Sequence, residues 1–300
     1  MKKLLSFSLV LVCAMSSFAQ TSLMATLNHE GTISTFYGVN ALKQAHAAAV
    51  SGDVITLSSG TFLSTDITKA VTIRGAGMDV SKAYDIVNEP TVLGGNLNIN
   101  IPAEDTGRLT LEGIFLNNDI CFSGGQVKNA LFLKSRFNYI YTNSGKIQDL
   151  TILNCRISRG FSIGSGTAQF LNSVVNNFEY GYISFSHCVI LSGSTSSSGN
   201  QYKNCIICCE RNISSSSSAY NNLFITGNTN ILNDIPNNTN LRVPTSDERF
   251  AYLRGYDDSK DYKLTDQNRD VLKATDGGEI GIYGGSLPYS AIPTNPQITK

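Results

Sequence analysis

The sequence lacks tryptophan, contains only 7 prolines and is poor in charge, since Asp, Glu, Lys and Arg make up 15% of its 300 residues. The usual share of charged residues is about one quarter. The formal net charge at pH 7 is zero, so the composition does not indicate a nucleic acid or an anionic membrane surface as a partner. Glycine, serine, threonine and asparagine are abundant instead, which suits stacked strands with polar outer faces.

Beyond the N-terminus, the sequence also lacks a long hydrophobic run. Lys2 and Lys3 precede an apolar stretch at residues 4 to 15, and Ser17-Phe18-Ala19 forms a small-x-small cleavage signal. This order is typical of a cleavable signal peptide over residues 1–19, and its apolar stretch is too short for a bilayer anchor. We therefore expect an exported chain, secreted or located in the periplasm or cell envelope, with no transmembrane segment in the mature part.

One phrase recurs between residues 109 and 225: an apolar residue, a polar residue that is often Asn, a small residue, and then β-branched or aromatic residues. Its copies follow one another at intervals of 15 to 22 residues. This interval is too short for a pair of helices and is typical of one turn of a β-solenoid. In such a fold each residue stacks on its counterpart in the next turn at a strand spacing of about 4.8 Å.

Placing the copies in register gives three columns of equivalent residues. Small residues suit close stacking, Asn suits the left-handed conformation of a sharp bend, and aromatic residues suit an inward stack. The small column is Gly113, Ser135, Cys155, Ser173, Cys188, Cys205 and Leu223. The bend column is Glu112, Lys134, Asn154, Asn172, His187, Asn204 and Asn222. The inward column is Thr110, Phe132, Ile152, Phe170, Phe185, Tyr202 and Tyr220.

Six cysteines follow the signal peptide, and an even number in an exported protein raises the question of disulfides. Three of them share the small column with Ser and Gly, which favours buried thiols. A bridge between Cys188 and Cys205 on adjacent turns is nevertheless geometrically allowed. Cys205, Cys208 and Cys209 lack a second Cys or His pair at zinc-ligand spacing, so we expect no metal site.

The region before the repeat predicts one helix, at about residues 40–50, and then strands. Its phrases are Asn40-Ala41-Leu42, Gly52-Asp53-Val54-Ile55-Thr56-Leu57 and Ala70-Val71-Thr72-Ile73-Arg74-Gly75. They resemble the opening of right-handed parallel β-helix proteins of the pectin-lyase-like superfamily. In that family the helix caps the solenoid, and members include polysaccharide lyases, hydrolases and secreted proteins without known activity. The resemblance implies an all-β fold, a right-handed parallel β-helix (β-solenoid) with an N-terminal capping α-helix.

A solenoid grows along one axis, so we expect a single domain over residues 20–300. Regular turns are predicted at about 53–225, and closing turns with a tail at 226–300. Residues 276–285, followed by Pro288 and Tyr289, resemble the closing turn of secreted bacterial β-helix proteins.

Two arginines are the best candidates for contacts with an acidic ligand. Arg136 and Arg156 follow the small column on adjacent turns, so both should point outward about 4.8 Å apart and could hold a carboxylate or a sulfate. The alternative is a pair of solvated surface arginines. No carboxylate cluster accompanies them in the sequence, and His187 is expected to be a bend residue rather than a general base.

Two aromatic trios alternate along the chain, and alternation along a strand places each trio on one face. They are Phe137, Tyr139 and Tyr141, and Phe178, Tyr180 and Tyr182. If these faces point outward, the four tyrosines would form a saccharide-binding strip together with the two arginines. If they point inward, both trios belong to the core.

These features favour a β-helix that binds a polysaccharide or a cell-surface glycan, or that has a structural or adhesive task at or outside the cell envelope. The alternative is a polysaccharide lyase or glycoside hydrolase acting on an acidic polysaccharide. A lyase would need a cation such as Ca²⁺ to neutralise the substrate carboxylate; otherwise no cofactor is expected. The sequence does not assign catalytic residues.

Overall fold

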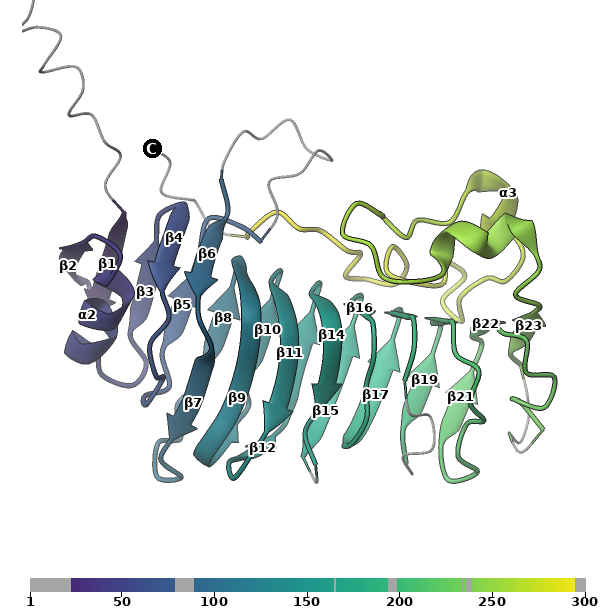
Figure 1. Cartoon of the computed structure of the whole chain (residues 1–300), viewed down its shortest axis with the longest axis horizontal. Coiled ribbons are helices and arrows are strands. Elements are labelled where there is room, and N and C mark those ends of the chain that lie inside the picture. Colours follow the sequence, from purple (N-terminus) through teal and green to yellow (C-terminus); the bar gives the residue numbers. More distant parts are fainter. Residues whose placement is uncertain are drawn as a thin grey trace, which may run out of the picture.

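The chain folds into a parallel β-solenoid of about eight turns, shown in Figure 1 as a computed structural model. The structure describes residues 23–78, 89–164, 166–193, 199–233, 235 and 239–294, and the predicted signal peptide lies outside them. Successive turns add strands to two long sheets around one apolar core. The all-β solenoid predicted from the repeat is confirmed, whereas its handedness and the capping role of the helix stay predictions.

Strands on one side of the shaft form sheet A, and strands on the other side form sheet B. Sheet A contains, in order, β2 (Thr32–Tyr37), β1 (Met24–His29), β3 (Val54–Leu57), β5 (Thr72–Arg74), β8 (Thr110–Glu112), β10 (Leu131–Leu133), β13 (Leu150–Leu153), β15 (Thr167–Leu171), β17 (Tyr182–Ser186), β19 (Gln201–Lys203) and β21 (Ser218–Tyr220). Sheet B contains β23 (Leu241–Val243), β22 (Leu223–Ile225), β20 (Ile206–Ile207), β18 (Val189–Ile190), β16 (Val174–Val175), β14 (Arg156–Ser162), β11 (Arg136–Thr142), β9 (Ile114–Lys128), β6 (Thr91–Gly94) and β4 (Gly60–Leu63), with β7 (Leu97–Ile101) and β12 (Lys146–Gln148) paired to β9.

The N-terminal end of the shaft carries an antiparallel hairpin that the sequence pattern does not predict. Strands β1 and β2 pair through a turn at Glu30 and Gly31, both with positive φ, a geometry that suits the twist of a two-residue hairpin. Strand β1 also pairs antiparallel with β3. The predicted helix is present as α2 (Ala41–Ala48), and it packs on β1, β2, β3 and β4.

Each turn of the repeat passes from sheet A to sheet B through a residue in the left-handed conformation, as the Asn-rich column predicts. The φ angles lie between 45° and 56° at Lys134, Asn154, Asn172, His187, Asn204 and Asn221. In the first and last copies the structure differs from the predicted register by one residue. Gly113, with φ of 66°, and Asn221 occupy the bend, rather than Glu112 and Asn222.

The small column is corrected in the same two copies. Ile114 and Asn222 occupy it instead of Gly113 and Leu223, and Leu223 pairs with Ile206 in the next column. Asn222 is fully buried because its amide group is used: Oδ1 accepts from the Cys205 backbone nitrogen at 2.8 Å, and Nδ2 donates to the Tyr202 carbonyl at 3.0 Å. A buried Asn whose side-chain amide is hydrogen-bonded can occupy a position that Ser or Cys fills in the other turns.

The inward column forms the predicted stack over its middle turns. Ring centroids lie 5.0 Å apart in Phe170 and Phe185 and 5.4 Å apart in Phe185 and Tyr202. At the last turn Ala219 points inward and Tyr220 is 48% exposed. Leu111 replaces Thr110 at the first turn. A shift of one residue along a strand reverses which face a side chain occupies, and this explains both errors.

After β23 the chain turns back and runs along one side of the shaft towards its N-terminal end (Figure 1). This C-terminal segment, residues 244–294, includes the short helices η1 (Glu248–Leu253) and α3 (Asp266–Arg269). Its Phe250, Leu253 and Ile282 form a second apolar cluster with Val189 and Ile206 on the outer side of sheet B. The segment therefore covers the apolar positions that follow the small column.

Candidate functional site

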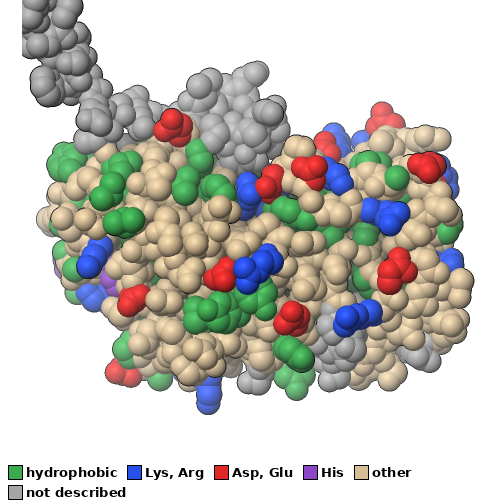
Figure 2. Space-filling model, viewed as in Figure 1, with side chains coloured by type: hydrophobic (Ala, Val, Ile, Leu, Met, Phe, Trp, Pro, Cys, Tyr) green, Lys and Arg blue, Asp and Glu red, His purple; other side chains and the backbone are tan. Residues whose placement is uncertain are grey.

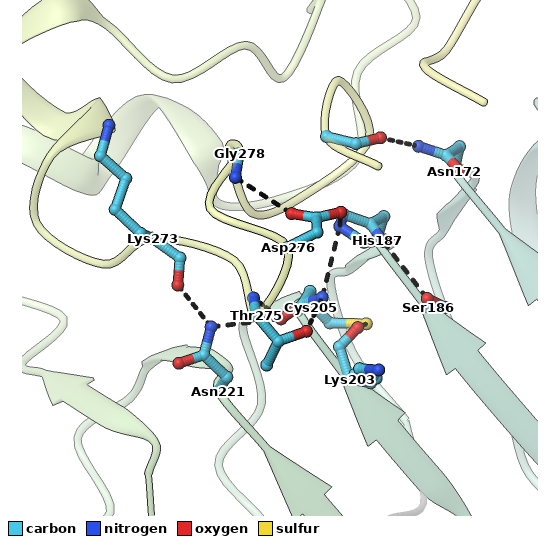
Figure 3. Close-up of polar contacts among 12 residues, drawn as sticks. Asn172, Ser186, His187, Lys203, Cys205, Asn221, Lys273, Thr275, Asp276 and Gly278 are labelled. Atoms are coloured by element: carbon cyan, nitrogen blue, oxygen red, sulfur yellow. Dashed lines mark hydrogen bonds and ion pairs between the residues drawn. The ribbon is translucent and has the colours of Figure 1, made fainter. Parts of the chain in front are cut away.

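The C-terminal segment is held by side chains of the bend column, one turn after another. The contacts, in order along the segment, are Asn221 to Lys273, Asn204 to Thr275, His187 to Asp276, Asn172 to Ile282 and Gly284, Asn154 to Pro288, and Lys134 to Ile292. Figure 3 shows the middle part of this row, with side chains reaching from the bends to the segment. The bend residues therefore also form an intramolecular docking surface.

His187 is a titratable member of this row and packs against polar and charged neighbours. Its Nε2 lies 3.6 Å from Asp276 Oδ2 and 3.4 Å from Asn204 Nδ2, and its Nδ1 lies 3.2 Å from Ser186 Oγ. Burial lowers the pKa of His187, the Asp276 charge opposes that decrease, and Lys203 adds to it. The bend role predicted for His187 is confirmed by its φ of 52°.

Arg136 and Arg156 pair in register on adjacent turns, as predicted, but both contact the protein's own C-terminal segment. Arg136 forms an ion pair with Asp258. Arg156 is only 7% exposed, and it donates to the Tyr289 hydroxyl at 2.9 Å and to the carbonyls of Asp258 and Lys260 at 3.0 and 2.9 Å. Both arginines point away from the solenoid core, and the C-terminal segment covers the Arg156 guanidinium. Arg136 and Arg156 are therefore not a pair of solvated surface arginines.

The tyrosines separate from their phenylalanine neighbours because of a strand irregularity. The register of β11 shifts between Phe137 and Tyr139, so Phe137 is fully buried while Tyr139 and Tyr141 are half-buried on the outer side. β11 has one residue fewer here than β9 and β14, and such a difference changes which face the following side chains occupy. The second trio divides in the same manner, since Phe178 is buried while Tyr180 and Tyr182 are 65% and 57% exposed. Neither trio lies on one face.

Tyr139 and Tyr141 lie next to each other, with ring centroids 5.5 Å apart. The Arg159 guanidinium lies over the Tyr139 ring, 5.0 Å from its centroid, and also lies 3.5 Å from Asp119 Oδ2. Asp119 pairs with Tyr139 in register, and its Oδ1 accepts from Asn138 at 3.0 Å. Figure 2 shows acidic and basic side chains around a hydrophobic group on this face, over β9, β11 and β14. We call Tyr139, Tyr141, Arg159 and Asp119 the sheet B cluster.

Two carboxylates act on the tyrosines of the sheet B cluster. Burial raises the pKa of Tyr139, the charge of Glu179 raises it further, and Arg159 opposes these effects. A hydrogen bond with Cys121 raises the pKa of Tyr141, and burial and the Asp119 charge add to it. Both phenols are therefore protonated at neutral pH and can donate hydrogen bonds.

Arg159, Asp119 and Glu179 were not assigned from the sequence. Their relation to Tyr139 could have been found by continuing the register beyond the bend. Asp119 and Gly160 flank Tyr139 on the neighbouring turns, and Arg159 comes directly before Gly160. The register shift hides this relation, because β9 and β14 each have one residue more than β11 between the paired positions, and this offsets the turns by one residue.

Tyr180 and Tyr182 do not join the arginines. Tyr180 follows the bridge between Phe161 and Phe178, and its carbonyl accepts from the Ile163 backbone nitrogen. Tyr182 begins β17 on sheet A, opposite Thr167 in β15. Tyr139 and Tyr141 thus lie together on sheet B while Tyr182 lies on sheet A, and the four tyrosines do not form a single strip with Arg136 and Arg156.

The cysteines and the acidic residues at 257, 258 and 261 were also considered as possible ligands. All six described cysteines are free thiols, with five of them buried and Cys208 half-buried. Among the described residues, no group of three His, Cys, Asp or Glu side chains could hold a metal ion. Within the acidic run near the C-terminus, Asp257 accepts from Ser259, Asp258 pairs with Arg136, and Asp261 accepts from the Lys263 nitrogen.

Comparison with known proteins gives no relative: no family model matches the chain, and no curated protein or solved structure matches it. In the part of the chain that the structure describes, no helix is long and apolar enough to cross a membrane. What can be said of function therefore depends on the fold and on the surface of the shaft.

Proposed function

We propose that the protein is an exported β-helix that binds a glycan on the outer side of sheet B, through the sheet B cluster. The observation that carries the proposal is the pair of half-exposed rings of Tyr139 and Tyr141, bordered by Arg159 and Asp119. Tyrosine rings pack on the apolar faces of sugars while their hydroxyls remain able to hydrogen-bond. Charged side chains add strong hydrogen bonds to sugar hydroxyls.

The contrast with Arg156 supports a ligand role for Arg159. Arg156 is buried and its guanidinium is used by the C-terminal segment. The Arg159 side chain is 62% exposed, and its ion pair with Asp119 at 3.5 Å is long. A solvent-exposed pair of this kind contributes little to stability, so its place beside two tyrosines favours recognition over architecture.

The binding proposal is tested with the full chain and a panel of neutral and acidic soluble polysaccharides, by affinity electrophoresis and calorimetry. Tyr139→Ala should weaken binding about 10-fold, the effect expected from one lost aromatic contact of about 1.4 kcal/mol. Tyr37→Ala is the matched control, because Tyr37 is 61% exposed on the N-terminal hairpin. The proposal would be wrong if wild type, Tyr139→Ala and Tyr37→Ala bound equally well, or if no polysaccharide of the panel bound to the wild type.

A second candidate function is glycan cleavage, and one observation favours it. Asp119 lies beside Arg159 at the Tyr139 ring, and the charge of Glu179 acts on the same tyrosine. Two carboxylates at one sugar site can serve as acid and base of a hydrolase, and a tyrosine or arginine can serve a lyase as a base. Release of reducing ends or of unsaturated product, abolished by Asp119→Asn or Glu179→Gln, would establish cleavage. If polysaccharides of the panel bind but none of them yields product, cleavage of these polysaccharides is excluded.

Export is the remaining part of the proposal. The support for it is that residues 1–19 contain a positively charged start, an apolar stretch and a small-x-small cleavage signal, in that order. The resemblance of residues 40–77 to pectin-lyase-like β-helix proteins supports the same interpretation. Mass spectrometry of the protein from the envelope or the medium should find a mature N-terminus at Gln20. An intact Met1 on a cytosolic protein would contradict export.

A further inference from the structure

A groove of about 410 Å³ lies on the outer side of sheet A, away from the sheet B cluster. It crosses four neighbouring strands, β13, β15, β17 and β19. Neighbouring strands are about 4.8 Å apart, so the groove extends over roughly 14 Å along the shaft. Its volume falls in the range of ligand sites.

Polar side chains in one register row form its floor. Thr151 pairs with Gln169, Gln169 with Ser184, and Ser184 with Gln201, and all four line the groove. Among the described residues, the side chains of Gln169, Ser184 and Gln201 make no hydrogen bond, whereas Asn172 and Asn204 of the bend column donate to the C-terminal segment. The floor therefore presents amide and hydroxyl groups with free hydrogen-bonding capacity at regular strand spacing.

An exposed aromatic ring borders this floor. Tyr182 pairs with Thr167 at the start of β17, is 57% exposed and lines the groove. Gly199 also lines it, and a Cβ at that position would lie 3.4 Å from the Tyr182 ring. The ring thus has close support on one side and remains open to solvent on the other. This combination of one ring and several amides suits a sugar, which has an apolar face and a rim of hydroxyls.

The charge of the groove narrows the class of ligand. Asp149 is the charged residue among its described lining residues, and its carboxylate accepts from the Thr167 hydroxyl at 3.3 Å. No cation among those residues could compensate an acidic sugar, and the Asp149 charge would repel one. The lining is suited to uncharged hydroxyl groups.

We propose that this groove is a second glycan site, specific for a neutral, extended chain such as a β-1,4-linked glucan. The floor is straight, because it follows a row of equivalent residues on stacked strands. Successive sugars of an extended chain can then meet successive turns of the shaft. The ring of Tyr182 packs on one sugar, and Gln169, Ser184 and Gln201 bind hydroxyls of its neighbours. This site does not depend on the sheet B cluster.

The test uses cellohexaose as the probe and the full chain, by isothermal titration calorimetry at low and high salt. Wild-type protein should bind cellohexaose, with an affinity that salt leaves unchanged because no charge is paired. Tyr182→Ala should weaken binding about 10-fold. The double variant Gln169→Ala/Gln201→Ala should weaken it by a similar factor, and its side chains are exposed enough to leave folding intact.

Tyr220→Ala is the matched control, because Tyr220 is 48% exposed on the outer side of the same sheet and does not line the groove. It should bind cellohexaose as wild type does, and so should Tyr139→Ala, which separates this site from the sheet B cluster. No cellohexaose binding, or binding unaffected by both groove variants, overturns the proposal. Stronger binding of hexagalacturonate, which is acidic, or of maltohexaose, which is curved, also overturns it.

Discussion

The side-chain amide of Asn172 donates a hydrogen bond of 2.8 Å to the carbonyl oxygen of Gly284, 112 residues further along the chain. The same Asn172 has a φ of 45° and forms the bend between β15 and β16. Glycine could adopt that conformation equally well but could not donate. The Asn-rich column is therefore explained by two requirements together, a left-handed backbone and a donor for the C-terminal segment.

Replacing Asn172 by Gly should separate these two requirements. Asn172→Gly keeps a residue suited to positive φ and removes hydrogen bonds of 2.9 and 2.8 Å to Ile282 and Gly284. The buried Gly284 carbonyl then loses this donor, and the Ile282 carbonyl keeps its hydrogen bond from the Tyr289 backbone nitrogen. We therefore expect the free energy of unfolding to fall by about 1–3 kcal/mol. Limited proteolysis should cut within the C-terminal segment sooner than in wild type.

The control for this change is Asn129→Gly. Asn129 is exposed, has a φ of 51° and makes no contact with the described part of the C-terminal segment. Its replacement should alter stability by less than about 0.5 kcal/mol. Equal losses in the two variants would mean that the bend conformation alone accounts for Asn in this column.

Arg156 and Arg159 are predicted to have opposite roles although they are three residues apart. Arg156→Ala leaves the carbonyls of Asp258 and Lys260 and the Tyr289 hydroxyl without their buried donor, so it should cost about 2–4 kcal/mol of stability. Arg159→Ala should change stability by less than about 0.5 kcal/mol, since its ion pair is exposed, and should weaken glycan binding.

Urea unfolding of both variants and titration with the best-binding polysaccharide of the panel measure these effects. A stable Arg156→Ala protein that loses glycan binding would reverse the assignment. It would restore the original hypothesis that Arg136 and Arg156 bind the ligand.

The sequence was sufficient to predict the solenoid, because its repeat requires equivalent residues in contact. It was insufficient at the first and last copies, where Glu112-Gly113 and Asn221-Asn222 each offer two residues that fit the pattern. Only the pairing with the neighbouring turn decides between them. The path of the C-terminal segment could not be predicted, since its hydrogen bonds to the bend column join residues 52 to 158 positions apart, such as Asn172 and Gly284.

The apolar residues after the small column could have predicted that another segment covers this side of sheet B. Val174, Val189 and Ile206 occupy an outward position of sheet B, and an outward apolar row requires a cover. The same reasoning applied to Arg156 predicts that it too is covered. For the sheet B cluster, continuing the register gives partners that are one residue out, because the shift after Phe137 leaves no mark in the residue types.

Stability should decrease when the pH falls below about 6.5, and His46 should contribute to the decrease. Burial lowers the pKa of His46 to about 4, and the charge of Lys69 adds to the effect. The unfolded chain binds a proton at about pH 6.5, so protons favour unfolding between pH 6.5 and 4. His46→Gln should flatten this part of the stability curve by on the order of 2 kcal/mol, after allowance for residual solvent screening.

The control for this pH dependence is His29→Gln. His29 pairs with Asp53, whose hydrogen bond raises the pKa of the imidazole, so its contribution is present at low pH and is lost as the pH rises. The two variants should change the slope with opposite signs. Parallel curves for wild type and His46→Gln would contradict the assignment.

The six cysteines should be unreactive thiols in the folded protein. Burial raises the pKa of Cys155 to about 12, and it does the same for the half-buried Cys208. A thiol reacts as its thiolate, so a thiol reagent at pH 8 should label the native mature chain slowly and label all six cysteines in guanidinium chloride. Labelling of fewer than six cysteines in the unfolded chain without reductant would indicate a disulfide. Cys188 and Cys205 would be the pair to examine first, because they lie on adjacent turns.

Gly160→Ala tests whether the position of the Tyr139 ring matters for glycan binding. A Cβ at Gly160 would lie 2.7 Å from the Tyr139 ring, a distance at which the ring has to move. The φ of Gly160 is not in the left-handed region, so the backbone accepts Ala and the fold should persist. We expect glycan affinity to fall several-fold with an unchanged far-ultraviolet circular dichroism spectrum. Gly94→Ala is the control, because its Cβ would meet β4 at an ordinary 3.6 Å. If Gly160→Ala binds as tightly as Gly94→Ala, the ring of Tyr139 does not contact the ligand.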